Sequence, residues 1–106
     1  MVGGIYFINI PYSDFKQYKA RPVLVYKIID TNDILILPLT TNLQRNGIVI
    51  TNKDVEKGSL KKDSVVIIPK ITAIDRSLIL VENHIATLKN SSFENVIKSI
   101  CKSLEC

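Results

Sequence analysis

The segment from residue 12 to residue 19 mixes aromatic with basic side chains and has neither helical nor alternating periodicity. Its aromatic and lysine residues are Tyr12, Phe15, Lys16, Tyr18 and Lys19. Rings that stack on bases, beside cations that hold phosphates, are typical of a surface that binds single-stranded nucleic acid. The alternative is an exposed loop whose aromatic rings pack on the rest of the fold.

Two further residues, Arg21 and Thr40, have side chains suited to a phosphate group. Arg21 precedes Pro22, which biases it to an extended backbone from which the side chain can reach out of a sheet. A guanidinium binds phosphate oxygens through two parallel hydrogen bonds, and a threonine hydroxyl can donate to the same group. The ordinary alternatives are a solvated arginine at a strand start and a β-branched strand residue before a turn.

The sequence offers little for metal chemistry. The sole histidine, His84, has no neighbouring cysteine or acidic cluster, and Cys101 and Cys106 lie five residues apart without a metal-binding spacing. We therefore expect no metal, no cofactor and two free thiols. The net charge of +4 favours approach to a polyanion, but many proteins with no nucleic-acid role carry such a charge.

The length of 106 residues fits a single domain spanning 1–106, and a hydrophobic fraction of 46% is enough to form a core. No apolar stretch approaches the roughly 20 residues that cross a bilayer. The apolar N-terminal segment lacks the basic region that precedes it in a signal peptide. We therefore expect a cytoplasmic protein with no membrane association.

Short apolar runs separated by turn residues predict an antiparallel sheet. The expected strands are residues 4–10, 21–29, 34–39, 47–50 and 64–74, with short additions at 77–81 and 84–88. Pro69 interrupts the run 64–74, which predicts a bend or an edge position there. Residues 52–58 are rich in turn formers and are expected to form a turn.

The C-terminal segment has a different period, because its apolar residues recur at intervals of three and four. These residues are Phe93, Val96, Ile97, Ile100, Cys101 and Leu104, and Ser91 and Ser92 precede them as candidate N-caps. The pattern predicts one amphipathic helix. Together, these elements predict an α+β domain in which a small, strongly curved antiparallel sheet, closed or nearly closed like a barrel, carries one C-terminal helix.

Five short motifs occur in an order and spacing that resemble the PemK/MazF toxins, and they cover nearly the whole chain. They are Tyr12 to Asp14, Arg21 to Val25, Leu37 to Asn42, Leu60 with Asp63 to Val66, and Lys70 to Asp75. No single motif is diagnostic, because an Arg-Pro pair before an apolar strand is common. Five motifs in the same order are hard to obtain by chance.

The resemblance implies a small SH3-like (CcdB/PemK-type) antiparallel barrel with a C-terminal helix, a homodimer, and a cognate antitoxin as partner. It also implies a sequence-specific endoribonuclease that cuts single-stranded mRNA. In that reaction the ribose 2′-hydroxyl attacks the phosphate and leaves a cyclic phosphate and a free 5′-hydroxyl. The chemistry needs a proton acceptor, a proton donor and positive charge, but it requires no metal.

The resemblance further implies roles for particular residues. Arg21 matches the family's catalytic arginine and Thr40 its threonine, which makes both of them catalytic candidates. The RNA-binding candidates are Tyr12, Asp14, Lys16, Tyr18, Lys19, Thr41 and Lys70. Pro69 departs from the pattern, because some family members have an acidic residue there for acid–base work; Asp14 or Lys70 would then serve instead. Asp75 fits a turn or a cap better than a general base.

Two other functions stay open on the sequence. A CcdB-like toxin shares the fold but acts by binding a topoisomerase, without nuclease chemistry. A relative that binds RNA without cutting it would fit the proline at position 69.

Overall fold

The structure, a computed structural model, describes residues 1–11 and 18–105. This part of the chain forms strands, short 3₁₀ turns and one α-helix. The strands are β1 (Gly4–Pro11), β2 (Tyr18–Ile28), β3 (Asp33–Thr40), β4 (Gly47–Ile50), β5 (Val55–Gly58), β6 (Ser64–Ile67), β7 (Thr72–Asp75) and β8 (His84–Leu88). The 3₁₀ turns span Asn52–Asp54, Arg76–Leu78 and Val81–Asn83, and helix α1 spans Asn90–Leu104.

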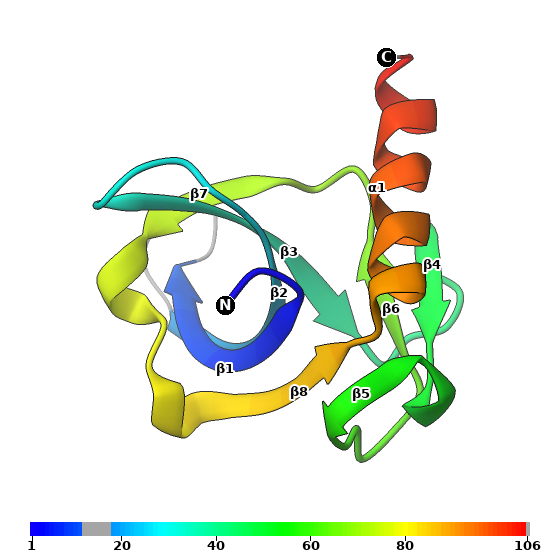
Figure 1. Ribbon diagram of the computed structural model, residues 1–106, viewed down its shortest axis with the longest axis horizontal. Helices are drawn as coiled ribbons and strands as arrows, with labels where there is room; N and C mark the ends of the chain where they lie inside the picture. Colours follow the sequence, from blue (N-terminus) through cyan, green and yellow to red (C-terminus); the bar gives the residue numbers. More distant parts are fainter. Residues whose placement is uncertain (12–17, 106) are drawn as a thin grey trace.

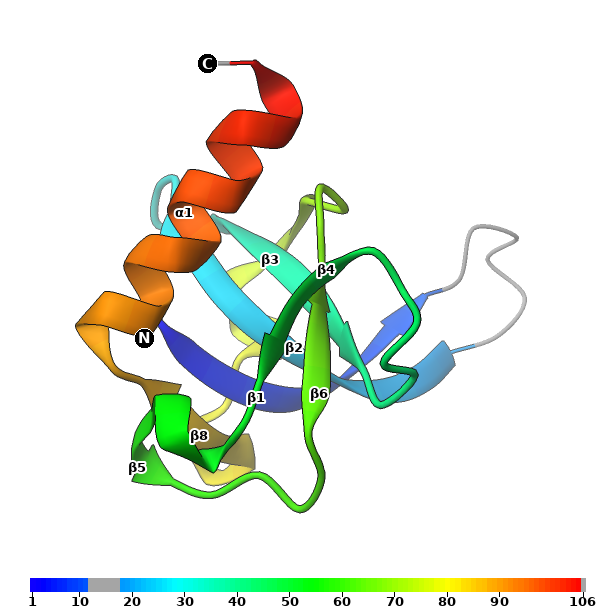
Figure 2. The ribbon, with the colours of Figure 1, turned by 90° about the vertical axis from the view of Figure 1, so that its right-hand side faces the viewer.

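The strands build one antiparallel sheet in the order β4-β6-β3-β2-β1-β8-β5, and β7 pairs with β3 further along the edge that β6 also occupies. Figure 1 shows this sheet curling around on itself, with α1 beside β4 and β6. Figure 2 shows α1 crossing one side of the curled sheet. The predicted fold class, a strongly curved antiparallel sheet with one C-terminal helix, is therefore confirmed.

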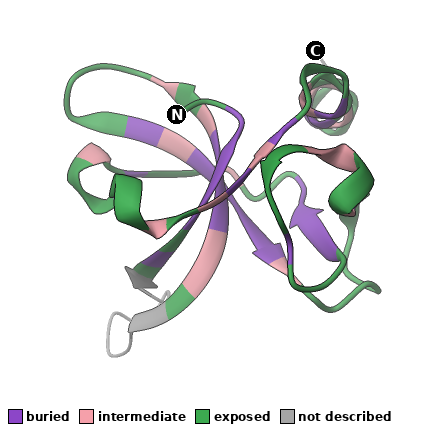
Figure 3. Ribbon diagram, turned by 60° about the horizontal axis from the view of Figure 1, so that its bottom comes forward, coloured by how far each residue is buried: buried purple, intermediate pink, exposed green. Residues whose placement is uncertain are grey.

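Two apolar clusters lie on the two faces of the central strands. One contains Leu24, Leu37 and Val66 and receives Val96 and Ile100 from α1. The other is formed from alternate positions of the same strands and from neighbouring elements, with the members Tyr6, Ile8, Val23, Val25, Ile34, Ile36, Ile74 and Ile79. Because β2 and β3 are covered on both faces, their sequences read as continuous apolar runs. Figure 3 shows buried residues along the crossing strands and exposed residues in most connections.

Helix α1 is anchored by a side chain that the sequence suggested as its cap. The N-cap residue is Lys89, which makes no side-chain capping bond, so the prediction that Ser91 or Ser92 caps the helix is wrong. The hydroxyl of buried Ser92 instead donates to Oδ1 of Asp54 at 2.7 Å. Oδ2 of Asp54 accepts from the backbone N–H of Thr51 at 2.9 Å. The first turn of α1 is thereby joined to the turn that precedes β5.

Three expected boundaries differ from the structure. β2 already begins at Tyr18, which pairs with Pro11, so the expected loop ends earlier than residue 19. Residues 55–58 form β5, an exposed and charged strand that carries no apolar alternation. Residues 77–81 form no strand, because Asp75 accepts a hydrogen bond from the N–H of Ser77 and starts a 3₁₀ turn. The expected bend at Pro69 is confirmed, since β6 ends at Ile67 and β7 begins at Thr72.

The expectation of free thiols also needs correction. Cys101, in the last turns of α1, is disulfide-bonded, and the only other cysteine of the chain, Cys106, lies outside the described residues. The spacing of the two cysteines in the sequence could not indicate a disulfide, because whether a bond can form depends on where the helix ends. α1 ends at Leu104, and Glu105 adopts the left-handed conformation with φ of 58°.

Candidate functional site

Arg21 and Thr40 lie at the same end of neighbouring strands. The antiparallel register sets Val23 of β2 opposite Pro38 of β3. Arg21 lies two residues beyond Val23 on β2, and Thr40 lies two residues beyond Pro38 on β3, at the same end of the two strands. Val23 and Pro38 project from one face because they stand opposite each other, and residues two apart on a strand share a face. The side chains of both residues are half-buried, so the fold places the two catalytic candidates together at one rim of the sheet.

The hydroxyl of Thr40 is held in a turn that leaves its hydrogen available. Oγ1 of Thr40 accepts from the backbone N–H of Asn42 at 3.2 Å. Oδ1 of Asn42 in turn accepts from the N–H of Gln44 at 3.1 Å. A hydroxyl that accepts one hydrogen bond can still donate its own proton. The turn therefore fixes the oxygen of Thr40 while its O–H stays able to reach a ligand oxygen.

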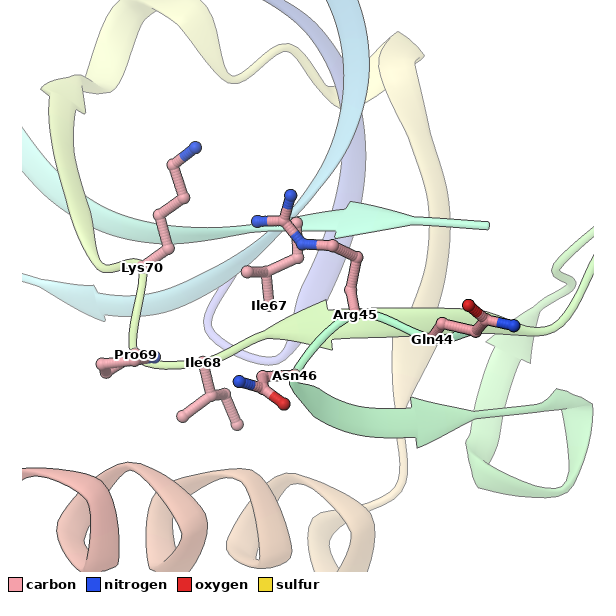
Figure 4. A pocket seen from close by; sticks show the side chains of 7 residues that line it. All are labelled: Gln44, Arg45, Asn46, Ile67, Ile68, Pro69 and Lys70. Carbon is pink, nitrogen blue, oxygen red and sulfur yellow. The ribbon is translucent and has the colours of Figure 1, made fainter. Parts of the chain in front are cut away.

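A groove with a volume of about 520 Å³ opens across β6 from Thr40. Val65 of β6 stands opposite Thr40, and Ile67, two residues further along the same face, lines the groove. Figure 4 shows the side chains of Arg45 and Lys70 rising over this groove. The structure thus places the RNA-binding candidate Lys70 in the lining of this groove. It also places there Arg45, a loop residue that no sequence motif indicated.

Thr41, another RNA-binding candidate, faces a different hollow. It lines an apolar depression of about 500 Å³ with Phe7, Pro22, Leu39 and Leu60. Leu39 belongs to the apolar cluster that α1 covers, so this depression lies on the sheet face opposite Arg21 and Thr40. Thr40 and Thr41 are thus adjacent in sequence but serve opposite sides of the sheet.

The remaining RNA-binding candidates fall either outside the described residues or at the start of β2. Tyr12, Asp14 and Lys16 lie outside the described residues. Tyr18 and Lys19 belong to β2, where they pair with Pro11 and Ile10. Tyr18 and Lys19 therefore lie beyond Arg21 on β2, toward the end of the sheet where Arg21 and Thr40 are found.

Asp75 has the structural role that was predicted for it. Hydrogen bonds from Ser77, from its side chain first and its backbone second, hold the pKa of this carboxyl below its ordinary value of 3.8. A carboxylate with a lowered pKa is a weak proton acceptor at neutral pH. Asp75 therefore starts a turn and is not suited to act as a general base.

Carboxylates are scarce around the groove. Its lining consists of Gln44, Arg45, Asn46, Ile67, Ile68, Pro69 and Lys70, which includes no acidic residue. Within residues 1–11 and 18–105, no three His, Cys, Asp or Glu side chains gather in an arrangement that could hold a metal ion. The chemistry that the described site offers therefore comes from cations, a hydroxyl and amides.

Comparison with known families agrees with the curled sheet and its C-terminal helix. Residues 1–104 match the PemK-like, MazF-like toxins of type II toxin–antitoxin systems. The chain belongs to this family. No curated protein matches the sequence closely enough to count as a relative.

Membership of the PemK-like, MazF-like family has two direct consequences. The toxins of this family generally cleave mRNA, and a type II toxin implies an antitoxin as its protein partner.

No helix in the described part of this toxin is long and apolar enough to cross a membrane. The family match covers the segments on both sides of the groove and the whole of α1.

Proposed function

We propose that this toxin is a sequence-specific endoribonuclease that cleaves single-stranded mRNA without a metal ion. The observation that carries the proposal is the position of Arg21 and Thr40 at the same end and on the same face of the neighbouring strands β2 and β3. A permanent positive charge and a hydroxyl donor in that arrangement can contact the same phosphate group. The family match adds that related toxins generally act on mRNA.

In the proposed reaction the ribose 2′-oxygen attacks the adjacent phosphorus while the bond from phosphorus to the 5′-oxygen breaks. The products are a 2′,3′-cyclic phosphate and a free 5′-hydroxyl. The guanidinium of Arg21 stabilises the negative charge that builds up on the equatorial oxygens of the phosphorane, and the O–H of Thr40 donates to one of them. Donors already in place at the developing charge lower the barrier most effectively.

Two proton transfers complete the reaction. One proton leaves the 2′-hydroxyl and one reaches the departing 5′-oxygen, and each transfer needs a group within hydrogen-bonding reach. Pro69 occupies the position where some family members have a carboxylate for this work, and a proline side chain cannot transfer protons. We propose Asp14, which lies outside the described residues, and Lys70, which lines the groove, as the groups that substitute for it.

We further propose that the toxin works in the cytoplasm as a homodimer. Its antitoxin would neutralise it by covering the surface that RNA uses. β4 and β5 form the two ends of the strand order in the sheet, and unpaired strand edges in a small domain favour pairing with a second copy.

Incubation of the pure protein with a long single-stranded RNA in EDTA tests the proposed function. Cuts at defined sites, with cyclic phosphate and 5′-hydroxyl ends, would support the nuclease. Protection of the RNA without cutting would mean that this relative binds RNA only. No effect on RNA would favour a toxin that acts on a protein target, as a CcdB-like toxin acts on a topoisomerase.

The second candidate function, RNA binding without cleavage, is favoured by one specific feature. Pro69 is exposed in the bend between β6 and β7, directly beside Lys70. The groove lining provides cations to hold a phosphate but no carboxylate to accept a proton. The EDTA experiment distinguishes this candidate from the nuclease, because a protein that only binds protects the RNA and produces no new ends.

A further inference from the structure

β1 loses its strand partner on one side part-way along its length. β8 pairs with β1 only through Gly4, Ile5 and Tyr6, and the register shifts before Tyr6. Beyond Tyr6, no strand among the described residues pairs with this side of β1. The chain that leads into β8 instead forms 3₁₀ turns, and a hollow of about 460 Å³ lies between these turns and the free edge of β1. We call this space the β1 hollow.

The walls of the β1 hollow combine exposed apolar side chains with amides. Three successive residues of β1, Phe7, Ile8 and Asn9, line one side, and Leu80 and Asn83 line the other. Phe7 and Leu80 are exposed. Asn9 is exposed and Asn83 half-buried, and within residues 1–11 and 18–105 neither side-chain amide takes part in a hydrogen bond. No charged residue belongs to the described part of the lining.

A nucleobase fits these walls better than a phosphate does. A flat ring can pack against the apolar side chains of Phe7 and Leu80, and an asparagine amide presents a donor and an acceptor that match the edge of a base. The volume lies within the range of roughly 300–1,000 Å³ that is typical of small-molecule sites. Because the described lining is uncharged, it adds no attraction for a phosphate.

The β1 hollow lies beside Arg21. Ile8 stands directly opposite Arg21 in the β1–β2 pair, and opposite residues project from the same face, roughly 5 Å apart. Thr40 belongs to β3, on the other side of β2. A phosphate on Arg21 would therefore have the base of a neighbouring nucleotide within reach of the hollow.

The described residues of the lining lie outside all five motifs by which the chain resembles its family. The β1 hollow is thus separate from the residues to which the resemblance gives a role in catalysis or RNA binding.

We propose that the β1 hollow holds the base of a nucleotide next to the cleaved phosphate, and that the amides of Asn9 and Asn83 read the hydrogen-bonding edge of this base. The hollow thereby sets part of the sequence preference of cutting. The proposal rests on the proposed function, because it concerns the same RNA. A free strand edge also suits an extended peptide, but the position next to Arg21 favours RNA.

The test compares base preferences. Sequencing the ends of the RNA products of the wild type locates its cut sites. Short RNAs that carry each of the four bases at the positions flanking the cut then give kcat/KM for every base. Asn83→Leu removes the amide and should reduce the preference at one flanking position about tenfold, because a well-placed amide contributes about that much discrimination between bases.

A second substitution should change the preference rather than remove it. Asn83→Asp replaces a donor and an acceptor with two acceptors. Guanine presents two neighbouring donors, N1–H and N2–H, on one edge, so the relative kcat/KM for guanine should rise at the same position. Asn9→Leu tests the other amide at an exposed strand position.

Asn90 provides matched controls, because it is exposed at the start of α1. Asn90→Leu and Asn90→Asp make the same chemical changes away from the β1 hollow, and they should keep the base preference of the wild type. Circular dichroism melts of every variant show whether the fold is intact.

The outcomes separate the base pocket from the proposed nuclease. If the wild type cuts RNA and the folded Asn9 and Asn83 variants keep its base preference, the pocket is overturned, the nuclease stands, and the free edge of β1 is left to a peptide. A changed preference in the Asn83 variants but not in the Asn90 variants supports the pocket.

A wild type that binds RNA without cutting it still tests the pocket. The same RNAs with 2′-O-methyl riboses then give the base preference of binding by fluorescence anisotropy, and an unchanged preference in the Asn9 and Asn83 variants overturns the pocket. If the wild type neither binds nor cuts RNA, the pocket and the nuclease are both overturned.

Discussion

At the scale of single residues, the proposed cleavage depends most on the positive charge of Arg21. Arg21→Ala should reduce RNA cleavage by about a hundredfold or more, because it removes the charge that stabilises the phosphorane. Cleavage rates on single-stranded RNA in EDTA measure the effect. Circular dichroism should show an intact fold, since a single charge at a strand rim adds little to stability. Cutting at the wild-type rate would remove Arg21 from the mechanism.

Thr40 provides a second residue test with a close control. Thr40→Val keeps the branched shape but deletes the hydroxyl that can donate to phosphate, and we expect cleavage to slow by about a hundredfold. Thr40→Ser keeps the hydroxyl and the acceptor for the N–H of Asn42, and it should retain most of the activity. Equal rates for the valine and serine variants would show that the hydroxyl is not used.

At the scale of elements, the hydrogen bond between Ser92 and Asp54 joins α1 to the sheet. Ser92→Ala should lower the free energy of unfolding by about 1–2 kcal/mol, because a buried hydroxyl then no longer donates to a carboxylate. Ser91→Ala is the matched control, since Ser91 is exposed, and it should change stability by less than about 0.5 kcal/mol. Urea denaturation of both variants measures the difference, and equal losses would contradict the anchoring role of Ser92.

The turn after β7 should make a contribution to stability that depends on pH. The folded-state pKa of Asp75 is lowered by its hydrogen bonds with Ser77, so the ionised carboxylate stabilises the fold above pH 3.8. That contribution is lost as the pH falls through the lowered pKa of the folded state. Asp75→Asn should therefore be less stable than the wild type at neutral pH, and the difference should shrink in acid.

Chemical denaturation at several pH values measures the effect at Asp75. Asp63→Asn serves as the control, because the exposed carboxylate of Asp63 makes no hydrogen bond within residues 1–11 and 18–105. A stability difference for Asp75→Asn that stays constant from neutral to acid pH would mean that the ionised carboxylate is not the stabilising form.

At the scale of the whole molecule, we predict a homodimer. The domain is small, its sheet has end strands at β4 and β5, and Val49 of β4 exposes about half of its side chain, 49%. Light scattering at micromolar concentration should give a mass near twice the 11.9 kDa of one chain. Dilution should lower the mass, because association depends on protomer concentration. A mass near 11.9 kDa throughout would contradict the prediction.

The sequence by itself determined most of the elements, because each depends on a local period. Continuous apolar runs marked β2 and β3, and a repeat of three and four marked α1. The order of the five motifs along the chain was enough to indicate the family. β5 was missed, since its middle residues, Glu56 and Lys57, are charged and exposed. Pairing with β8, rather than any pattern of its own, makes it a strand.

Only the tertiary structure decided which residues meet. Arg21 and Thr40 are far apart in the chain, and the antiparallel pairing of β2 with β3 puts them at the same end of neighbouring strands. No sequence pattern indicated Arg45, because a loop residue belongs to no hydrophobic period. Arg45 lines the groove because the loop between β3 and β4 crosses β6. Thr41 was grouped with Thr40 by sequence but lies on the other face. Local patterns specify elements, whereas strand register and chain crossings between distant segments specify the site.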